Sequence, residues 1–240
     1  MTSTIAGQTS PAHDTAASGS WLRLAGIAGL AHVVLFIGLV SIFIQVPGDG
    51  SVEEIRAHFS EHAGAMNFAA WAALGIFSLL LVYAAGIRHV IAETEVDQAA
   101  GGLWSRLWWA GNVTIFAVGI VASAFWGALA QDDVIDSASD GLINALMALD
   151  SITFFVCGQW AYFVFGAAAA VVYCRSRSLP TWLGVVSGIA AVLAPVSGLW
   201  IVFDDNSYGP WGALGIPSML LGVVFYVATS IMLIRRSSIA

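Results

Sequence analysis

Six long apolar stretches constrain the fold of this chain more than any other feature of its sequence. They cover residues of about 21–45, 67–88, 103–130, 152–174, 181–203 and 210–234. Each stretch meets the length of roughly 20 residues that a helix needs to cross a hydrocarbon core about 30 Å thick. Because backbone groups in lipid must be satisfied within their own segment, each stretch is expected to be a helix. The sequence therefore predicts an all-α fold, a polytopic transmembrane bundle of six helices.

The composition supports this class and excludes several others. Of the 240 residues, 59% are apolar and 10% are charged, against roughly 25% charged in soluble domains. All eight basic residues are arginines, so the chain has no lysine amine for a Schiff-base cofactor. A net charge of −7 without a basic cluster lacks the cationic footprint that nucleic-acid binding requires. We expect no cofactor and no nucleic-acid partner.

The apolar stretches also define the organisation of the chain. Residues 1–20 carry few apolar side chains and are predicted to form a flexible cytoplasmic tail. The first apolar stretch is long enough to span and is expected to be an uncleaved anchor. Residues 21–236 then form the transmembrane domain, and residues 237–240 form a short cytoplasmic tail. Pro195 and Pro217 interrupt the last two stretches.

The arginines predict the orientation. If the spans alternate, one end of the bundle carries Arg23, Arg88, Arg106, Arg175, Arg177, Arg235 and Arg236. Only Arg56 falls at the other end, together with most of the acidic residues, among them Asp204 and Asp205. Positive residues near span ends mark the cytoplasmic side. We therefore expect a multi-pass protein of the bacterial cytoplasmic membrane with both chain termini in the cytoplasm.

A patterned segment follows the first span. Ser51 and Glu54 have the spacing of a capping box, and residues 52–63 are predicted to form an amphipathic helix on the membrane surface, in the first outer loop. His58, Glu61 and His62 within it spell H-x-x-E-H, a zinc-binding pattern. A catalytic zinc needs a third protein ligand, for which the sequence offers the acidic residues Asp132, Asp133, Asp136 and Asp140. The alternatives are a structural metal site and a solvated polar face.

Polar residues within the spans are the other functional candidates, because each is costly to keep in lipid. The candidate ligand-binding residues are His32, Asn112, Asp150, Gln159 and Trp160. His32 lies near mid-bilayer and has no second histidine at matching depth, so a bis-histidine haem site is not expected. Each of these residues also has a structural interpretation, such as a hydrogen bond between helices or, for Asp150, a favourable charge at a helix N-terminus.

Aromatic and small residues leave two further alternatives open. The aromatic residues near the outer leaflet are Trp71, Trp126, Trp160, Tyr162, Trp200, Tyr208 and Trp211. They serve as interfacial anchors or line an outward-facing pocket for an apolar ligand. Small-residue pairs such as Ala25 with Gly29 and Gly184 with Gly188 pack helices within one chain or form the interface of a homo-oligomer or a membrane complex.

Three phrases carry a resemblance to a known group. SVEEIRAHFSEHAG precedes the second span, GLINALMALDS precedes the fourth and RSRSLPTWLG enters the fifth. In this order they resemble uncharacterised six-span integral membrane proteins of high-GC, actinobacterial bacteria. The resemblance implies the fold and the membrane location, implies no particular reaction, and suggests that other residues are tolerated at the position of His58.

These observations leave three hypotheses of function. The first is a non-catalytic binding or accessory protein that holds a lipid-like or apolar small molecule in an outward-opening cavity, with membrane lipids as its surroundings. The second is a small transporter or channel in which His32 and Asp150 respond to protons. The third is a membrane metallo-hydrolase that uses His58, Glu61 and His62.

Overall fold

The computed structural model describes residues 11–43, 45–47, 50–96, 101–176, 179–203 and 212–238. This part of the chain is all-helical and contains no strand, which confirms the predicted all-α class. The elements are α1 (Pro11–Phe43), α2 (Val52–Glu61), α3 (Ala63–Val96), α4 (Leu103–Leu129), α5 (Asp132–Ser137), α6 (Asp140–Ser151), the π-helix η1 (Ile152–Cys157), α7 (Gly158–Arg175), α8 (Thr181–Ser197), α9 (Trp200–Phe203) and α10 (Gly215–Arg236).

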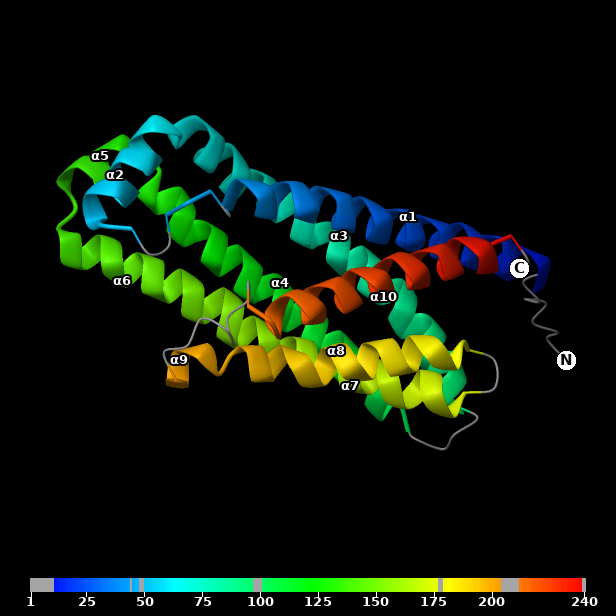
Figure 1. The fold of residues 1–240 in the computed structure, drawn as a ribbon. Helices are drawn as coiled ribbons and strands as arrows, with labels where there is room; N and C mark the ends of the chain where they lie inside the picture. The colour runs from blue at the N-terminus through cyan, green and yellow to red at the C-terminus, as the bar shows by residue number, and fades with distance from the viewer. Residues whose placement is uncertain are drawn as a thin grey trace, which may run out of the picture.

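The long helices form a closed ring in chain order. α1 packs on α3, α3 on α4, α4 on α7, α7 on α8 and α8 on α10, and α10 returns to pack on α1 (Figure 1). Glycines allow close contact where the ring closes: a Cβ added to Gly26 would lie 2.6 Å from the Ser230 carbonyl oxygen. The beginning of α1 therefore lies beside the end of α10, at the same end of the bundle.

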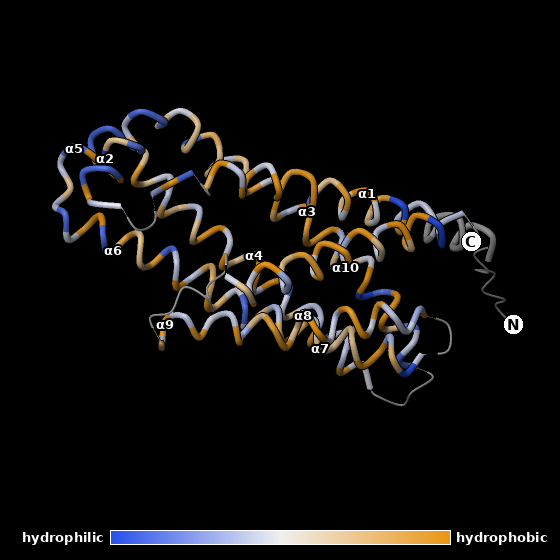
Figure 2. The backbone as a smooth tube through the Cα atoms, in the orientation of Figure 1, coloured by the Kyte–Doolittle hydropathy of each residue, from blue (hydrophilic) through white to orange (hydrophobic). Residues whose placement is uncertain are grey.

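Five helices in the described part of the chain are long and apolar enough to cross a membrane. They are Gly19–Phe43, Ala63–Glu95, Leu103–Leu129, Asp140–Arg175 and Gly215–Arg236. Large apolar side chains cover the outside of the ring, among them Trp71 with 70% of its surface exposed. Hydrophilic residues gather around α2 and α5 and at the opposite end (Figure 2). A soluble monomer rarely exposes so much apolar surface, so these helices suggest a membrane protein.

The predicted fifth span is shorter than expected. α8 is apolar but has 17 residues and ends at Ser197, and the short α9 follows after Gly198 and Leu199. Pro195 explains the early end, because proline has no N–H to donate to the carbonyl four residues earlier. Pro217, in contrast, does not interrupt a helix, since α10 begins at Gly215 and proline is tolerated in a first turn.

Two other helices extend beyond the predicted spans. α6, η1 and α7 are continuous over the 36 residues Asp140–Arg175, which corresponds to about 54 Å at 1.5 Å per residue. α1 begins at Pro11 rather than near residue 21, because a helix already nucleated by an apolar span extends readily into adjoining alanines. The expected flexible tail is therefore helical from Pro11 onward, and residues 1–10 lie outside the described residues. The same holds for Arg177, Asp204, Asp205, Tyr208 and Trp211 from the sequence analysis.

A small cap covers the end of the bundle opposite the two chain ends. It comprises α2, α5 and the first turn of α6. Ser51 and Glu54 form the predicted capping box, with bonds of 3.3 and 2.8 Å. Ile55 and Phe59 are buried against Trp126 and neighbouring residues of the cap. The apolar face of α2 is thus covered by protein, and its expected placement in the membrane surface is not supported.

Arg56 fastens the cap. Its guanidinium donates to the carbonyl oxygens of Ile135 and Ala138 and lies 3.3 Å from the Asp140 carboxylate. These contacts join α2 to α5, to Ala138 after it and to the first residue of α6. Because Phe59 of α2 packs against Trp126 of α4, the cap also positions one wall of the cavity described next.

Candidate binding cavity

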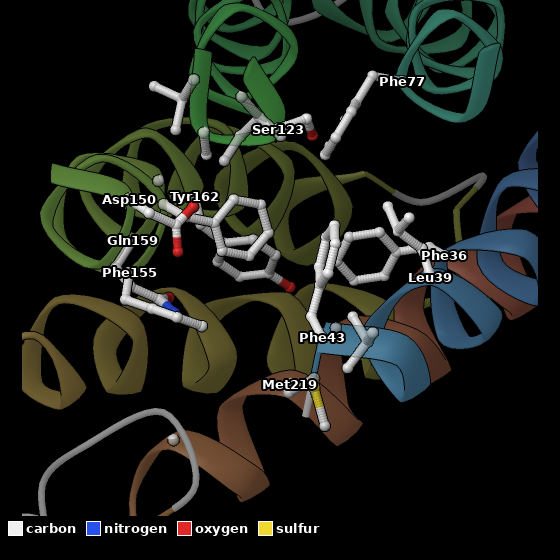
Figure 3. A pocket seen from close by; sticks show the side chains of 18 of the residues that line it. Phe36, Leu39, Phe43, Phe77, Ser123, Asp150, Phe155, Gln159, Tyr162 and Met219 are labelled. Atoms are coloured by element: carbon white, nitrogen blue, oxygen red, sulfur yellow. The ribbon is translucent and has the colours of Figure 1, made fainter. Parts of the chain in front are cut away.

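The half of the ring next to the cap contains a partly open cavity of about 840 Å³. Its lining comes from α1, α3, α4, α6, η1, α7 and α10, with Trp200 of α9 beside them. Figure 3 shows Asp150 and Phe155 on one side of this space, Phe36 and Phe43 of α1 on another, and Met219 of α10. The lining is mostly apolar, and pockets for small molecules have volumes of about 300–1,000 Å³. The size and the surface both suit a small organic ligand.

The structure brings three of the five predicted ligand-binding residues together. His32, Asp150 and Gln159 line the cavity, although they come from α1, α6 and α7. Trp160 does not line it. Successive residues of a helix are rotated by about 100°, so Trp160, which follows Gln159, lies on the outside with 57% of its surface exposed. Asn112 is buried within the helix packing, where its Nδ2 donates to the Trp108 carbonyl oxygen at 2.9 Å. The prediction that Asn112 and Trp160 contact a ligand is therefore not supported by their positions.

His32 is held rigidly in the cavity wall. Its Nδ1–H donates to the Ile76 carbonyl oxygen of α3 at 2.9 Å. The imidazole stacks on Phe36 at 5.6 Å between ring centroids and also contacts Phe77 and Tyr226. The bond to Ile76 assigns the proton to Nδ1, which leaves Nε2 as the acceptor of a neutral ring. His32 thus combines the structural role and the cavity position that the sequence left as alternatives.

Asp150 provides the carboxylate of the cavity. It lies at the end of α6, is only 7% exposed and lies beside the Trp126 indole of α4. The π-helix η1 begins two residues later, and Phe154 and Phe155 of η1 also line the cavity. Single-turn π segments occur frequently at functional sites because they redirect side chains within a helix. Nothing in the hydropathy of this stretch predicts η1.

Two polar atoms at the cavity have no partner among the described residues. They are the hydroxyl of Tyr162 and the indole N–H of Trp200, and both residues line the cavity. A buried polar group without a partner costs about 1–3 kcal/mol. A ligand with hydrogen-bonding atoms would satisfy them. Trp126, Tyr162 and Trp200 are the members of the predicted outer aromatic group that line the pocket, whereas Trp71 and Trp160 face outward.

An aromatic core fills the ring on the side away from the cap. It consists of the fully buried Tyr83, Trp108, Phe165, Tyr173 and Phe225. On α4, for example, Trp126 lines the cavity near the cap, whereas Trp108, further from the cap, donates to the Ala84 carbonyl oxygen. The Tyr83 hydroxyl is bonded to Thr229 at 2.6 Å. The cavity therefore ends at this core.

The H-x-x-E-H segment does not form a three-ligand metal site. No three His, Cys, Asp or Glu side chains gather closely enough to hold a metal ion in the part of the chain that the structure describes. His62 caps the end of α2, and its Nδ1 bonds to the carbonyl oxygen of His58 at 3.0 Å, while the two rings stack. Asp140, one of the predicted third ligands, is paired with Arg56. The predicted catalytic zinc at His58, Glu61 and His62 is therefore not supported by the described residues.

The cap histidines nevertheless affect each other. Partial burial lowers the pKa of His58, and the neighbouring His62 lowers it further, while Glu61 opposes both effects.

Comparison of the chain with protein-family models, with curated proteins and with solved structures finds no match. The functional argument therefore depends on the cavity.

Proposed function

We propose that this chain is a six-span protein of the bacterial cytoplasmic membrane that binds an apolar or lipid-like small molecule in the cavity between its helices. The number of crossings is supported by the ring itself: the start of α1 and the end of α10 lie at one end, which requires an even number of passes. α8 with α9 supplies the sixth pass beside five longer helices. The resemblance to six-span actinobacterial proteins agrees with this count.

The positions of the arginines support cytoplasmic termini. Arg23 lies in the first part of α1, and Arg235 and Arg236 end α10. Arg56, at the opposite end, is bonded to two carbonyl oxygens and to Asp140, so a structural contact explains this departure from the positive-inside rule. The cap and the cavity then lie on the outer side.

The cavity carries the proposal of binding. It combines a volume of about 840 Å³, a largely apolar lining and two unpartnered polar atoms, on Tyr162 and Trp200. Small-molecule sites have this composition, with a few polar groups that orient the ligand. The aromatic core closes the other half of the ring, which favours a bound molecule over an open channel.

The binding proposal is testable with a neutral fluorescent probe, N-phenyl-1-naphthylamine, and purified protein in lipid nanodiscs. We expect saturable fluorescence enhancement beyond that of empty nanodiscs. Ala122→Trp fills the cavity, because Ala122 is buried and lines it, and should weaken binding at least fivefold. Val121→Trp is the matched control, since Val121 is exposed on the outside of the same helix. Fluorescence enhancement that never saturates, or probe binding that is equal in both variants, would overturn the proposal.

A second candidate, a proton-responsive transporter, is favoured by one observation: His32 and Asp150 line the same cavity. It predicts proton-dependent flux of a substrate into proteoliposomes. Flux that persists unchanged when both residues are replaced by alanine would eliminate it.

A further inference from the structure

The charge of the cavity is unbalanced. Among the described residues that line it, Asp150 is the one acidic residue, and none is an arginine. The chain has no lysine at all. The ion pairs found in the described residues join Arg56 to Asp140 and His89 to Glu93, and neither involves Asp150. The carboxyl group therefore lies in a largely apolar space without an ion-pair partner among the described residues, and the one basic side chain in the described lining, His32, donates its Nδ1–H to the Ile76 carbonyl oxygen.

Aromatic rings line the cavity that holds this carboxyl group. Trp126 lies beside Asp150, and Phe43, Phe155, Trp200 and Tyr226 line the same cavity. The face of an aromatic ring is electronegative and attracts a cation, more strongly when water is excluded. A buried carboxylate also needs a compensating charge or donors. Both features favour a positive ligand and disfavour a negative one.

The unpartnered Tyr162 hydroxyl and Trp200 indole N–H carry no charge, so they orient a ligand without setting the sign of its charge. The sign is set by Asp150. We infer that the cavity selects an organic cation, with its positive group beside Asp150 and its apolar body against the aromatic rings. This inference rests on the proposed binding function and adds the chemical class of the ligand to it.

Two probes of nearly equal shape and opposite charge test the inference directly. Tetraphenylphosphonium and tetraphenylborate are each used to displace N-phenyl-1-naphthylamine from the protein in nanodiscs, with free concentrations corrected by empty nanodiscs. We expect displacement by the phosphonium at a free concentration at least tenfold lower than that required for the borate. Equal displacement by both ions, or preference for the borate, would overturn the inference while leaving the binding proposal intact.

A variant series assigns the preference to one residue. Asp150→Asn should reduce the affinity for the phosphonium at least tenfold relative to the affinity for the neutral probe. Asp136→Asn is the control, because Asp136 is an exposed carboxylate on α5, and it should leave the phosphonium affinity unchanged. Asp150→Glu keeps the charge and should retain the preference. An unchanged affinity ratio in Asp150→Asn would contradict the inference, and the comparison of the two ions on the unmodified protein decides it if that variant does not fold.

A third outcome separates the two proposals. If the neutral probe fails to bind saturably to the unmodified protein, the proposed function fails, and the charge selectivity fails with it. If the neutral probe binds but the two ions do not differ, only the charge selectivity is wrong.

Discussion

Glu95 joins the end of α3 to the start of α4. The residue is 2% exposed at the end of α3. Its carboxylate accepts the backbone N–H groups of Trp104 at 2.6 Å and Ser105 at 3.0 Å, in the first turn of α4. The N-cap of α4 is Gly102, whose φ of 76° makes the turn and which has no side chain to cap the helix. Glu95 therefore caps α4 from the neighbouring helix.

Replacing Glu95 with glutamine keeps the shape of the side chain but removes the charge and one acceptor. Hydrogen bonds to a charged group contribute about 1.5–3 kcal/mol, and a negative charge at a helix N-terminus adds about 0.3–1 kcal/mol. The amide NH₂ of glutamine would also face a backbone donor that it cannot satisfy. We expect Glu95→Gln to lower the free energy of unfolding by about 2–4 kcal/mol.

The measurement is a titration with sodium dodecyl sulfate from mild detergent, followed by tryptophan fluorescence and by circular dichroism. Glu93→Gln is the matched control two residues earlier. Glu93 is 54% exposed and pairs with His89 at 3.1 Å, and exposed pairs contribute about 0.2–1 kcal/mol. If the two variants lose the same stability, the carboxylate of Glu95 does not cap α4 as described.

Two further predictions use the same titration, and a third uses amide hydrogen exchange. Gly29→Ala should destabilise the bundle by about 1–3 kcal/mol, because the new Cβ collides with the Ser230 hydroxyl. In the control Gly38→Ala, the new Cβ meets no atom within 4 Å, and this variant should be neutral or stabilising by up to about 1 kcal/mol. Equal effects of the two variants would contradict the packing of α1 on α10. Arg56→Gln should loosen the cap, seen as faster amide exchange in α5 with unchanged exchange in α8; unchanged exchange in α5 would argue against the clamp. The pKa of His58 is lowered in the folded state, so the contribution of His58 to stability is present above about pH 6.5 and is lost as the pH falls below that value. His58→Gln should therefore reduce the loss of stability between pH 7.5 and 5.5. Identical pH profiles of the variant and the unmodified protein would refute this.

Hydropathy predicted the helices better than their ends. The stretch 152–174 was found because it is continuously apolar, but the polar residues from Asp140 onward belong to the same helix. A hydropathy window cannot detect such an extension, because polar residues in a continuing helix resemble those of a loop. Pro195 was recognised as an interruption, yet the sequence did not show that α8 ends two residues later.

The candidate site was predicted in part, for a similar reason. His32, Asp150 and Gln159 were chosen because polar groups in lipid are costly, and all three line the cavity. Depth along a span says little about which way a side chain faces, so Trp160 was chosen where the nearby Tyr162 lines the cavity. The inward-facing side becomes known only when the neighbours of each helix are known. The cap of α4 by Glu95 depends on a contact between helices and was not predicted for the same reason.

The order of the ring has a consequence for how the protein is made. In the ring of long helices, every packed pair except α1 with α10 joins consecutive members of the ring, so those pairs can assemble one after another during synthesis. The contact between α1 and α10 can form only after α10 has been synthesised. Because α10 supplies Met219 and Tyr226 to the cavity wall, a nascent chain that lacks this last helix would have a pocket open sideways to the bilayer.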